Sequence, residues 1–286
     1  TIRRISDIGD LMFPIIPASS AAAVSGNQEG IFAYGDTGSA TAISNLVSNA
    51  GVVGSDVSGV GTARDYLEGC EYGDDKGIFA YGYTGSNVSM SNLVSNSGVV
   101  GSDVSGVGTA RNGAAACSYG EDKGIFGYGH DGSGYTGVTN LVSNSGVVAS
   151  DVSGVGTAGG YGAATEYGDD KGIFGYGTGP VSKTNLVSNA GVVATDTTGV
   201  GTARSAPVAC AYGGDKGIFA YGSAGGVTAV SNLVSNSGVV ASDVSGVGTA
   251  RYDAAACEYG GDKGICGYGT TGSVTAVTNL VSNAGV

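Results

Sequence analysis

The segment Gly124-Ile125-Phe126-Gly127-Tyr128-Gly129 decides the fold, because the chain repeats it at nearly constant spacing. Copies of Gly-Ile-Phe-(Ala/Gly)-Tyr-Gly begin at Gly30, Gly77, Gly124, Gly172 and Gly217, and a sixth copy begins at Gly264 with Cys266 in place of phenylalanine. Self-similarity at a period of roughly 40–50 residues is typical of repeat architectures, among them propellers.

Two further motifs lie between these copies. Asn-Leu-Val-Ser-Asn follows each one, and after the first five Asp-Val-Ser-Gly-Val-Gly-Thr-Ala-Arg, or a near copy, follows in turn. Six units of about 47 residues therefore cover nearly all of residues 1–286. We expect a single domain with no linker.

Each unit is predicted to hold four short strands. In the third unit these are residues 114–119, 124–128, 140–144 and 147–151. Clusters of Gly, Asn and Asp bound each run, as turns require. No segment shows a sustained apolar period of 3.6 residues, so we expect almost no helix.

The second strand predicts how the sheets stack. Alternation places Phe126 and Tyr128 on one face and Ile125 on the other, so both faces are apolar and both need cover. The first strand is nearly all Ala, Gly and Cys, which suits a crowded axis. These features together predict a six-bladed β-propeller of four-stranded blades. A β-solenoid and an intertwined trimeric fibre are the alternatives.

The two ends of the chain favour the propeller. The last unit stops at Val286, inside its fourth strand, and Ile5-Ser6-Asp7 matches Ala241-Ser242-Asp243 of an ordinary unit. We therefore expect residues 1–19 to be a closure segment that supplies the outer strand of the last blade. Such an exchange removes an open sheet edge, whereas a solenoid would need capping units.

The pattern resembles kelch-type repeats, in which an arginine follows strand four and an apolar strand two ends in glycine. The matching arginines are Arg64, Arg111, Arg204 and Arg251. Tyr128-Gly129 stands where kelch repeats have paired glycines, and the chain has no tryptophan. The wording of the repeat also resembles structural and fibre proteins of tailed, especially marine, phages. That resemblance implies a virion or fibre component.

Charge and composition exclude several function classes. Asp plus Glu is 24 and Lys plus Arg is 12, for a net charge of −12, so we expect no nucleic-acid partner. No apolar stretch approaches the length of a membrane span, so we expect no membrane insertion. His130 is the only histidine and has no catalytic companions. We expect no enzyme activity, no metal and no cofactor.

The cysteines share one register. Cys70, Cys117, Cys210 and Cys257 occupy the same position of the first strand, and Val24 and Thr165 fill it elsewhere. This indicates a small packing position; a ring of metal-binding thiols is the alternative. Cys257 and Cys266 lie on neighbouring strands of one unit, and a disulfide between them stays open.

The connections that vary between units predict the binding face. The turns after the first and third strands are almost invariant, but the other two connections vary, and in an up-and-down blade both emerge at the same end. Binding is commonly placed on such loops; neutral drift would give the same pattern. The candidate binding residues are Tyr66, Tyr83, His130, Asp131, Tyr135, Tyr161, Lys183, Tyr252 and Asp253.

The sequence thus leads to a hypothesis of a non-enzymatic structural or attachment protein, located in a virion or outside the cell. Its partners would be other virion or filament proteins and host-surface glycans. A soluble lectin-like module, with equivalent sugar sites on several blades, is the main alternative. A polysaccharide-cleaving enzyme is the third.

Overall fold

The computed structural model describes residues 28–286, and every regular element in this range is a β-strand. The described strands form six antiparallel sheets, of which the first has two strands and the others have three. The strands are β1 (Gly30–Ala33), β2 (Ser44–Val47), β3 (Glu68–Tyr72), β4 (Lys76–Ala80), β5 (Ser91–Val94), β6 (Ala115–Tyr119), β7 (Lys123–Gly127), β8 (Thr139–Val142), β9 (Ala163–Tyr167), β10 (Lys171–Gly175), β11 (Thr184–Val187), β12 (Val208–Tyr212), β13 (Lys216–Ala220), β14 (Ser231–Val234), β15 (Ala255–Tyr259), β16 (Lys263–Gly267) and β17 (Thr278–Val281).

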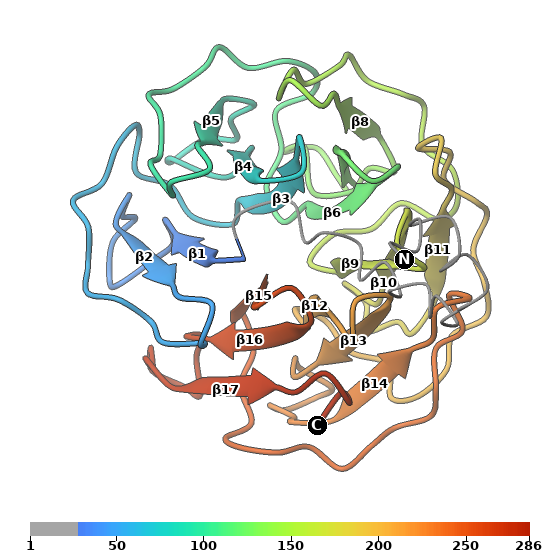
Figure 1. The fold of residues 1–286 in the computed structure, drawn as a ribbon. Helices are drawn as coiled ribbons and strands as arrows, with labels where there is room; N and C mark the ends of the chain where they lie inside the picture. The colour runs from blue at the N-terminus through green and yellow to red at the C-terminus, as the bar shows by residue number, and fades with distance from the viewer. Residues whose placement is uncertain (1–27) are drawn as a thin grey trace, which may run out of the picture.

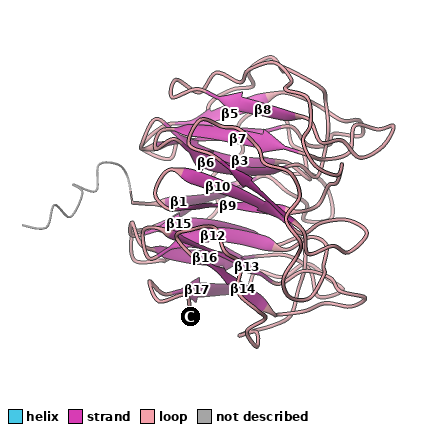
Figure 2. Ribbon diagram, turned by 90° about the vertical axis from the view of Figure 1, so that its right-hand side faces the viewer, coloured by secondary structure: helices cyan, strands magenta, loops and turns pink. Residues whose placement is uncertain are grey.

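The six sheets follow one another around a common centre (Figure 1). In each three-stranded sheet the first strand of the unit is innermost and the third is outermost. The strands run roughly along the central axis, so their connecting loops gather at the two ends (Figure 2). The repeated units predicted from the sequence are therefore repeated sheets.

The core lies between neighbouring sheets. In five of the six units the tyrosine after the Gly-Ile-Phe or Gly-Ile-Cys strand packs edge-to-face on a phenylalanine of the next sheet, as Tyr81 does on Phe126 with ring centroids 5.4 Å apart. This geometry is the one that aromatic quadrupoles favour. Tyr268, after the last middle strand, makes the same contact with Phe32 of the first sheet at 5.3 Å. The last sheet thus packs against the first.

These tyrosines correct one prediction. Phe126 and Tyr128 do not share a face, because Phe126 contacts the preceding sheet while Tyr128 contacts Phe174 of the following one. The backbone of Tyr128 has φ of 63°, in the left-handed region, so the alternation of the strand ends there. All six equivalent tyrosines share this conformation, which is rare for a bulky residue.

The predicted fourth strand is also wrong in the first five units. There the segment after the third strand forms isolated bridges with that strand and no continuous ladder. In the third unit the segment meets β8 only at two isolated bridges, Val142 with Val148 and Thr139 with Val152. Two residues separate the bridges on β8 but three separate them on the outer segment. The extra residue is a β-bulge, which interrupts the ladder. The side chain of Asn140 fills the interruption by donating to the carbonyl of Ala149.

The predicted closure segment, residues 1–19 with Ile5-Ser6-Asp7, lies outside the described residues.

Candidate functional site

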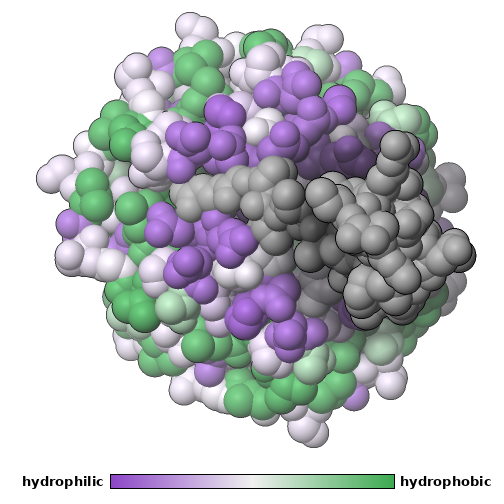
Figure 3. All heavy atoms as spheres, viewed as in Figure 1, coloured by the Kyte–Doolittle hydropathy of each residue, from purple (hydrophilic) through white to green (hydrophobic). Residues whose placement is uncertain are grey.

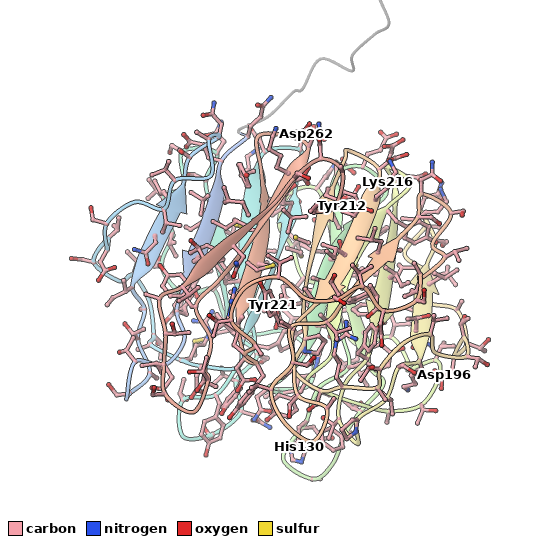
Figure 4. The ribbon with its side chains drawn as sticks, turned by 90° about the horizontal axis from the view of Figure 1, so that it is seen from below. His130, Asp196, Tyr212, Lys216, Tyr221 and Asp262 are labelled. Carbon is pink, nitrogen blue, oxygen red and sulfur yellow. The ribbon has the colours of Figure 1, made fainter. Side chains whose placement is uncertain are left out.

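The two ends of the molecule differ in chemistry. At one end the hairpin turns carry ion pairs such as Lys123–Asp122, at 2.5 Å, and Asn144 donates to the same carboxylate. Figure 4 places Asp262 and Lys216 at this end and His130 at the opposite one. On the turn end, polar residues gather around the centre and hydrophobic residues around the circumference (Figure 3). The loop that carries His130, one of the variable connections, therefore lies at the other end, which we call the variable end.

A chain of backbone hydrogen bonds organises the variable end. The second residue before each of the inner strands β3, β6, β9, β12 and β15 has a left-handed backbone, with φ between 48° and 56°. The amide of Gly113 donates to the carbonyl of Tyr66 at 2.9 Å, Tyr161 donates to Gly113 at 2.8 Å, and Ala206 donates to Tyr161 at 2.7 Å. These residues come from successive inter-sheet segments, so the hydrogen bonds link each segment to the next. The five residues at this position are Tyr66, Gly113, Tyr161, Ala206 and Asp253.

Two tyrosines meet at this position although they belong to segments two sheets apart. The rings of Tyr66 and Tyr161 pack edge-to-face, with centroids 5.6 Å apart and planes at 87°. Gly113 lies between them, and a Cβ there would fall 2.9 Å from the Tyr161 ring. The glycine therefore makes the contact sterically possible.

Polar side chains extend the pair outward. The hydroxyl of Tyr161 donates to Oδ1 of Asn112 at 3.1 Å, and Nδ2 of Asn112 donates to Oδ1 of Asn87 at 2.8 Å. Nδ2 of Asn87 in turn donates to the carbonyl of His130 at 2.9 Å. Side chains and backbone of four segments are thereby fixed relative to one another, as a preorganised site requires.

The loop after β7 supplies a second aromatic pair. The rings of His130 and Tyr135 pack edge-to-face at 5.2 Å, and Nδ1 of His130 accepts the Gly132 amide. Tyr135 lies over Gly160, where a Cβ would fall 3.1 Å from its ring. We call Tyr66, Asn87, Asn112, His130, Tyr135 and Tyr161 the axial cluster.

Two carboxylates that form no ion pair within residues 28–286, Asp65 and Asp253, border the axial cluster. Oδ1 of Asp65 is buried and has no hydrogen-bond partner among residues 28–286. Burial, and then the charge of Asp36, raise the pKa of Asp65 above its usual value. Partial desolvation also raises the pKa of Asp253. Burial is the largest cause of the raised pKa values of Tyr66 and Tyr161, and the charges of Asp65 and Asp253 raise them further. The arrangement offers aromatic surface together with unsatisfied acceptors.

The remaining predicted residues divide into two groups. Tyr83 and Tyr252 lie on the variable end, where their backbones pair with Asp65 and Thr270. Asp131 accepts the amides of its own loop, which lowers its pKa.

The side chain of Lys183 points into the interior of the protein. Its ammonium donates to the carbonyl of Thr157 and lies 3.6 Å from the carboxylate of Asp196. The structure therefore does not bring Lys183 to the axial cluster.

Three residues of the site were missed from the sequence. Asp65, Asn87 and Asn112 lie in the variable connections, but nothing in their residue types set them apart. The one available signal was register, since Asp65 and Asn112 hold equivalent positions immediately before the left-handed residue of each segment.

The cysteines of the first strands act in packing. Sγ of Cys117 lies against Gly172 of the next sheet, where a Cβ would be 2.5 Å away. The part of the chain that the structure describes contains no group of three or more His, Cys, Asp or Glu arranged to hold a metal ion. Within the same residues no helix could span a membrane.

Comparison of the chain with protein-family models and with curated proteins returns no match.

Proposed function

We propose that the six sheets form a β-propeller and that the chain is a non-enzymatic attachment or structural protein, acting in a virion or outside the cell. Its variable end binds the partner, and the axial cluster is the centre of that surface. The observation that carries this proposal is the convergence of Tyr66 and Tyr161 across Gly113, beside the buried Asp65 Oδ1, which has no hydrogen-bond partner among residues 28–286.

The propeller assignment is supported by the contact of Tyr268 with Phe32, which joins the last sheet to the first. Within residues 28–286, the second to fifth blades would then each consist of three strands and a bulged outer segment, instead of four regular strands. A solenoid would leave its first and last sheets far apart.

The chemistry of the axial cluster fits a glycan. Tyrosine rings offer apolar faces to sugar rings, and carboxylate and amide groups accept and donate hydrogen bonds to hydroxyls. Tyr66 is 46% exposed and Tyr135 is 43% exposed, so both rings are accessible. Other virion or filament proteins are the second class of partner for the same surface.

A soluble lectin-like module is the second candidate, and stoichiometry distinguishes it. A lectin with equivalent sites on several blades binds several sugars per chain. The axial cluster draws its two central tyrosines from only two of the inter-sheet segments, and the equivalent residues elsewhere are Gly113, Ala206 and Asp253. It therefore predicts one site per chain.

The test is binding of the labelled, purified protein to a glycan array and to candidate host cells. The double variant Tyr66→Ala/Tyr161→Ala should weaken saturable binding roughly tenfold or more, since two aromatic contacts are worth about 1 kcal/mol each. Tyr83→Ala is the matched control, because Tyr83 is exposed at the same end but makes no ring contact within residues 28–286.

Circular dichroism must show that the double variant stays folded. Binding that survives the double variant but is lost in Tyr83→Ala would contradict the axial cluster as the site. Absence of binding from the folded parent protein would leave a structural role, whose partner belongs to the assembled particle.

A further inference from the structure

Among residues 28–286, fewer of the repeated contacts join the sixth sheet, β15–β16–β17, to the fifth. Tyr221 faces Cys266 where four other tyrosines in the series face the phenylalanine of the next unit along the chain. Thr62, Thr109, Thr157 and Thr202 each bind an aspartate of the following unit. Thr249 forms no such bond within residues 28–286, and Gly248 lies against Asn279.

Two thiols meet at this junction. Sγ of Cys210, on β12 of the fifth sheet, lies so close to Gly264 of β16 that a Cβ there would be 2.4 Å away. Gly264 and Cys266 are two residues apart on one strand, so they share a face. Cys210 and Cys266 belong to one buried cluster, with 5% and 1% of their surfaces exposed. Interaction with the Cys266 thiol is the first cause of the raised pKa of Cys210, ahead of burial.

The register separates Cys266 from Cys257, the partner that the sequence left open. Cys257 pairs with Ile265, and Cys266 pairs with Ala256. Neighbouring positions of paired strands face opposite sides of a sheet, so the two thiols point apart. Sγ of Cys257 lies instead against Gly30 of the first sheet.

We propose that Cys210 and Cys266 are a disulfide pair that fastens the sixth sheet to the fifth. The oxidant is a low-molecular-weight disulfide such as oxidised glutathione. One cysteine thiolate attacks its S–S bond and releases one glutathione thiolate; the second cysteine then displaces the other. One protein S–S bond forms, two electrons pass to the glutathione disulfide, and the two thiol protons end on the two released glutathiones.

The full chain allows a direct test, because trypsin separates the cysteines. Cleavage after lysine and arginine places Cys210 in peptide 205–216, Cys257 in 252–263 and Cys266 in 264–286. After treatment with oxidised glutathione we expect peptides 205–216 and 264–286 to be linked. The intact mass should fall by two hydrogen atoms, and the melting temperature should rise and return after reduction.

Variants taken from the repeat itself supply the controls. Cys266→Phe restores the residue of the other units and should abolish both the link and the redox dependence of melting. Cys210→Thr, which copies Thr165 at the equivalent position, should do the same, whereas Cys257→Ala should leave both unchanged. Oxidation in low urea, below the unfolding transition, gives the buried thiols access to the oxidant. A link between 252–263 and 264–286, or no link under either condition, would overturn the pairing.

Discussion

Four arginines and one lysine fill the same place between neighbouring sheets. Arg64, Arg111, Arg204 and Arg251 are fully buried, and each guanidinium lies over a tyrosine of the preceding sheet, about 4 Å from the ring centroid. Gly159 holds this position between the third and fourth sheets. There Lys183 lies 5.9 Å from the ring of Tyr128 and donates to Thr157, as the arginines do to their own threonines. Lys183 thus replaces the missing arginine.

The replacement is incomplete, and this gives a prediction at the residue scale. A cavity of about 30 Å³ remains beside Gly159 and Lys183. Lys183→Val, the residue of the equivalent Val138, should lower the free energy of unfolding by about 1–2 kcal/mol, since it removes a charged donor. A Cβ at residue 159 meets only one atom, at 4.0 Å, so Gly159→Arg is sterically allowed there.

A double-mutant cycle measured by urea unfolding tests this assignment. Gly159→Arg should restore stability in the Lys183→Val background, and should help less when Lys183 is present, because two cations would then share one place. If Gly159→Arg changes the free energy of unfolding equally in both backgrounds, the arginine and Lys183 do not occupy the same place.

At the scale of elements, the junction between sheets depends on the bulged outer segment. Asp151 of this segment accepts hydrogen bonds from the amide and hydroxyl of Thr109 and from Nδ2 of Asn140. Gly108 allows the approach, since a Cβ there would be 2.3 Å from the Asp151 carboxylate. The same carboxylate thus ties the outer segment to its own sheet and to the inter-sheet segment before it.

Asp151→Ala should therefore lower the free energy of unfolding by about 2–3 kcal/mol, because hydrogen bonds to a charged acceptor are lost together. Asp131→Ala is the matched control, since Asp131 bonds only within its own exposed loop. Urea unfolding of both variants measures the difference. A similar loss of unfolding free energy in both variants would mean that the hydrogen bonds of Asp151 contribute nothing beyond a surface carboxylate.

The elements show what the sequence could predict. The first three strands and the hairpin turns followed from apolar alternation and from turn residues such as those around Asp122. The left-handed backbone of Tyr128 could not be predicted, because bulky residues generally avoid that conformation. The bulge depends on one residue of excess in the outer segment, which is visible only once the register is known. Likewise, the Tyr66–Tyr161 contact requires the ring geometry and Gly113.

At the scale of the whole molecule, three glutamates influence one another across the centre. Glu71, Glu166 and Glu258 hold the same position on β3, β9 and β15, which belong to alternate sheets. Burial, and then the charges of Glu71 and Glu258, raise the pKa of Glu166 to about 9, and the pKa of Glu258 rises to about 8. Carboxylates of alternate inner strands can interact only across the axis.

The raised pKa values predict how stability depends on pH. Glu166 is protonated more readily in the folded chain than in the unfolded chain, where its pKa is near 4.5. The destabilisation of the folded state by the Glu166 carboxylate is therefore absent below about pH 4.5 and grows as pH rises toward 9. Glu166→Gln should melt at the same temperature as the parent near pH 4.5 but at a higher temperature at pH 8.5 and above.

Thermal melts across this pH range measure the difference. Glu121→Gln removes an exposed carboxylate from a hairpin turn, and its melting temperature should not diverge from that of the parent as pH rises. A Glu166→Gln difference that is constant with pH would indicate a packing effect in place of a proton-linked one.

The bulged outer segments have a further consequence for how the protein behaves when crowded. Exposed valines recur along the circumference, among them Val99, Val147 and Val192, each more than 60% exposed. A regular outer strand with such residues would be a template for pairing with neighbouring molecules. The extra residue in each bulge breaks the row of backbone donors and acceptors that such pairing needs. At high protein concentration the circumference of the molecule can therefore contact other molecules through its side chains without starting the growth of intermolecular sheets.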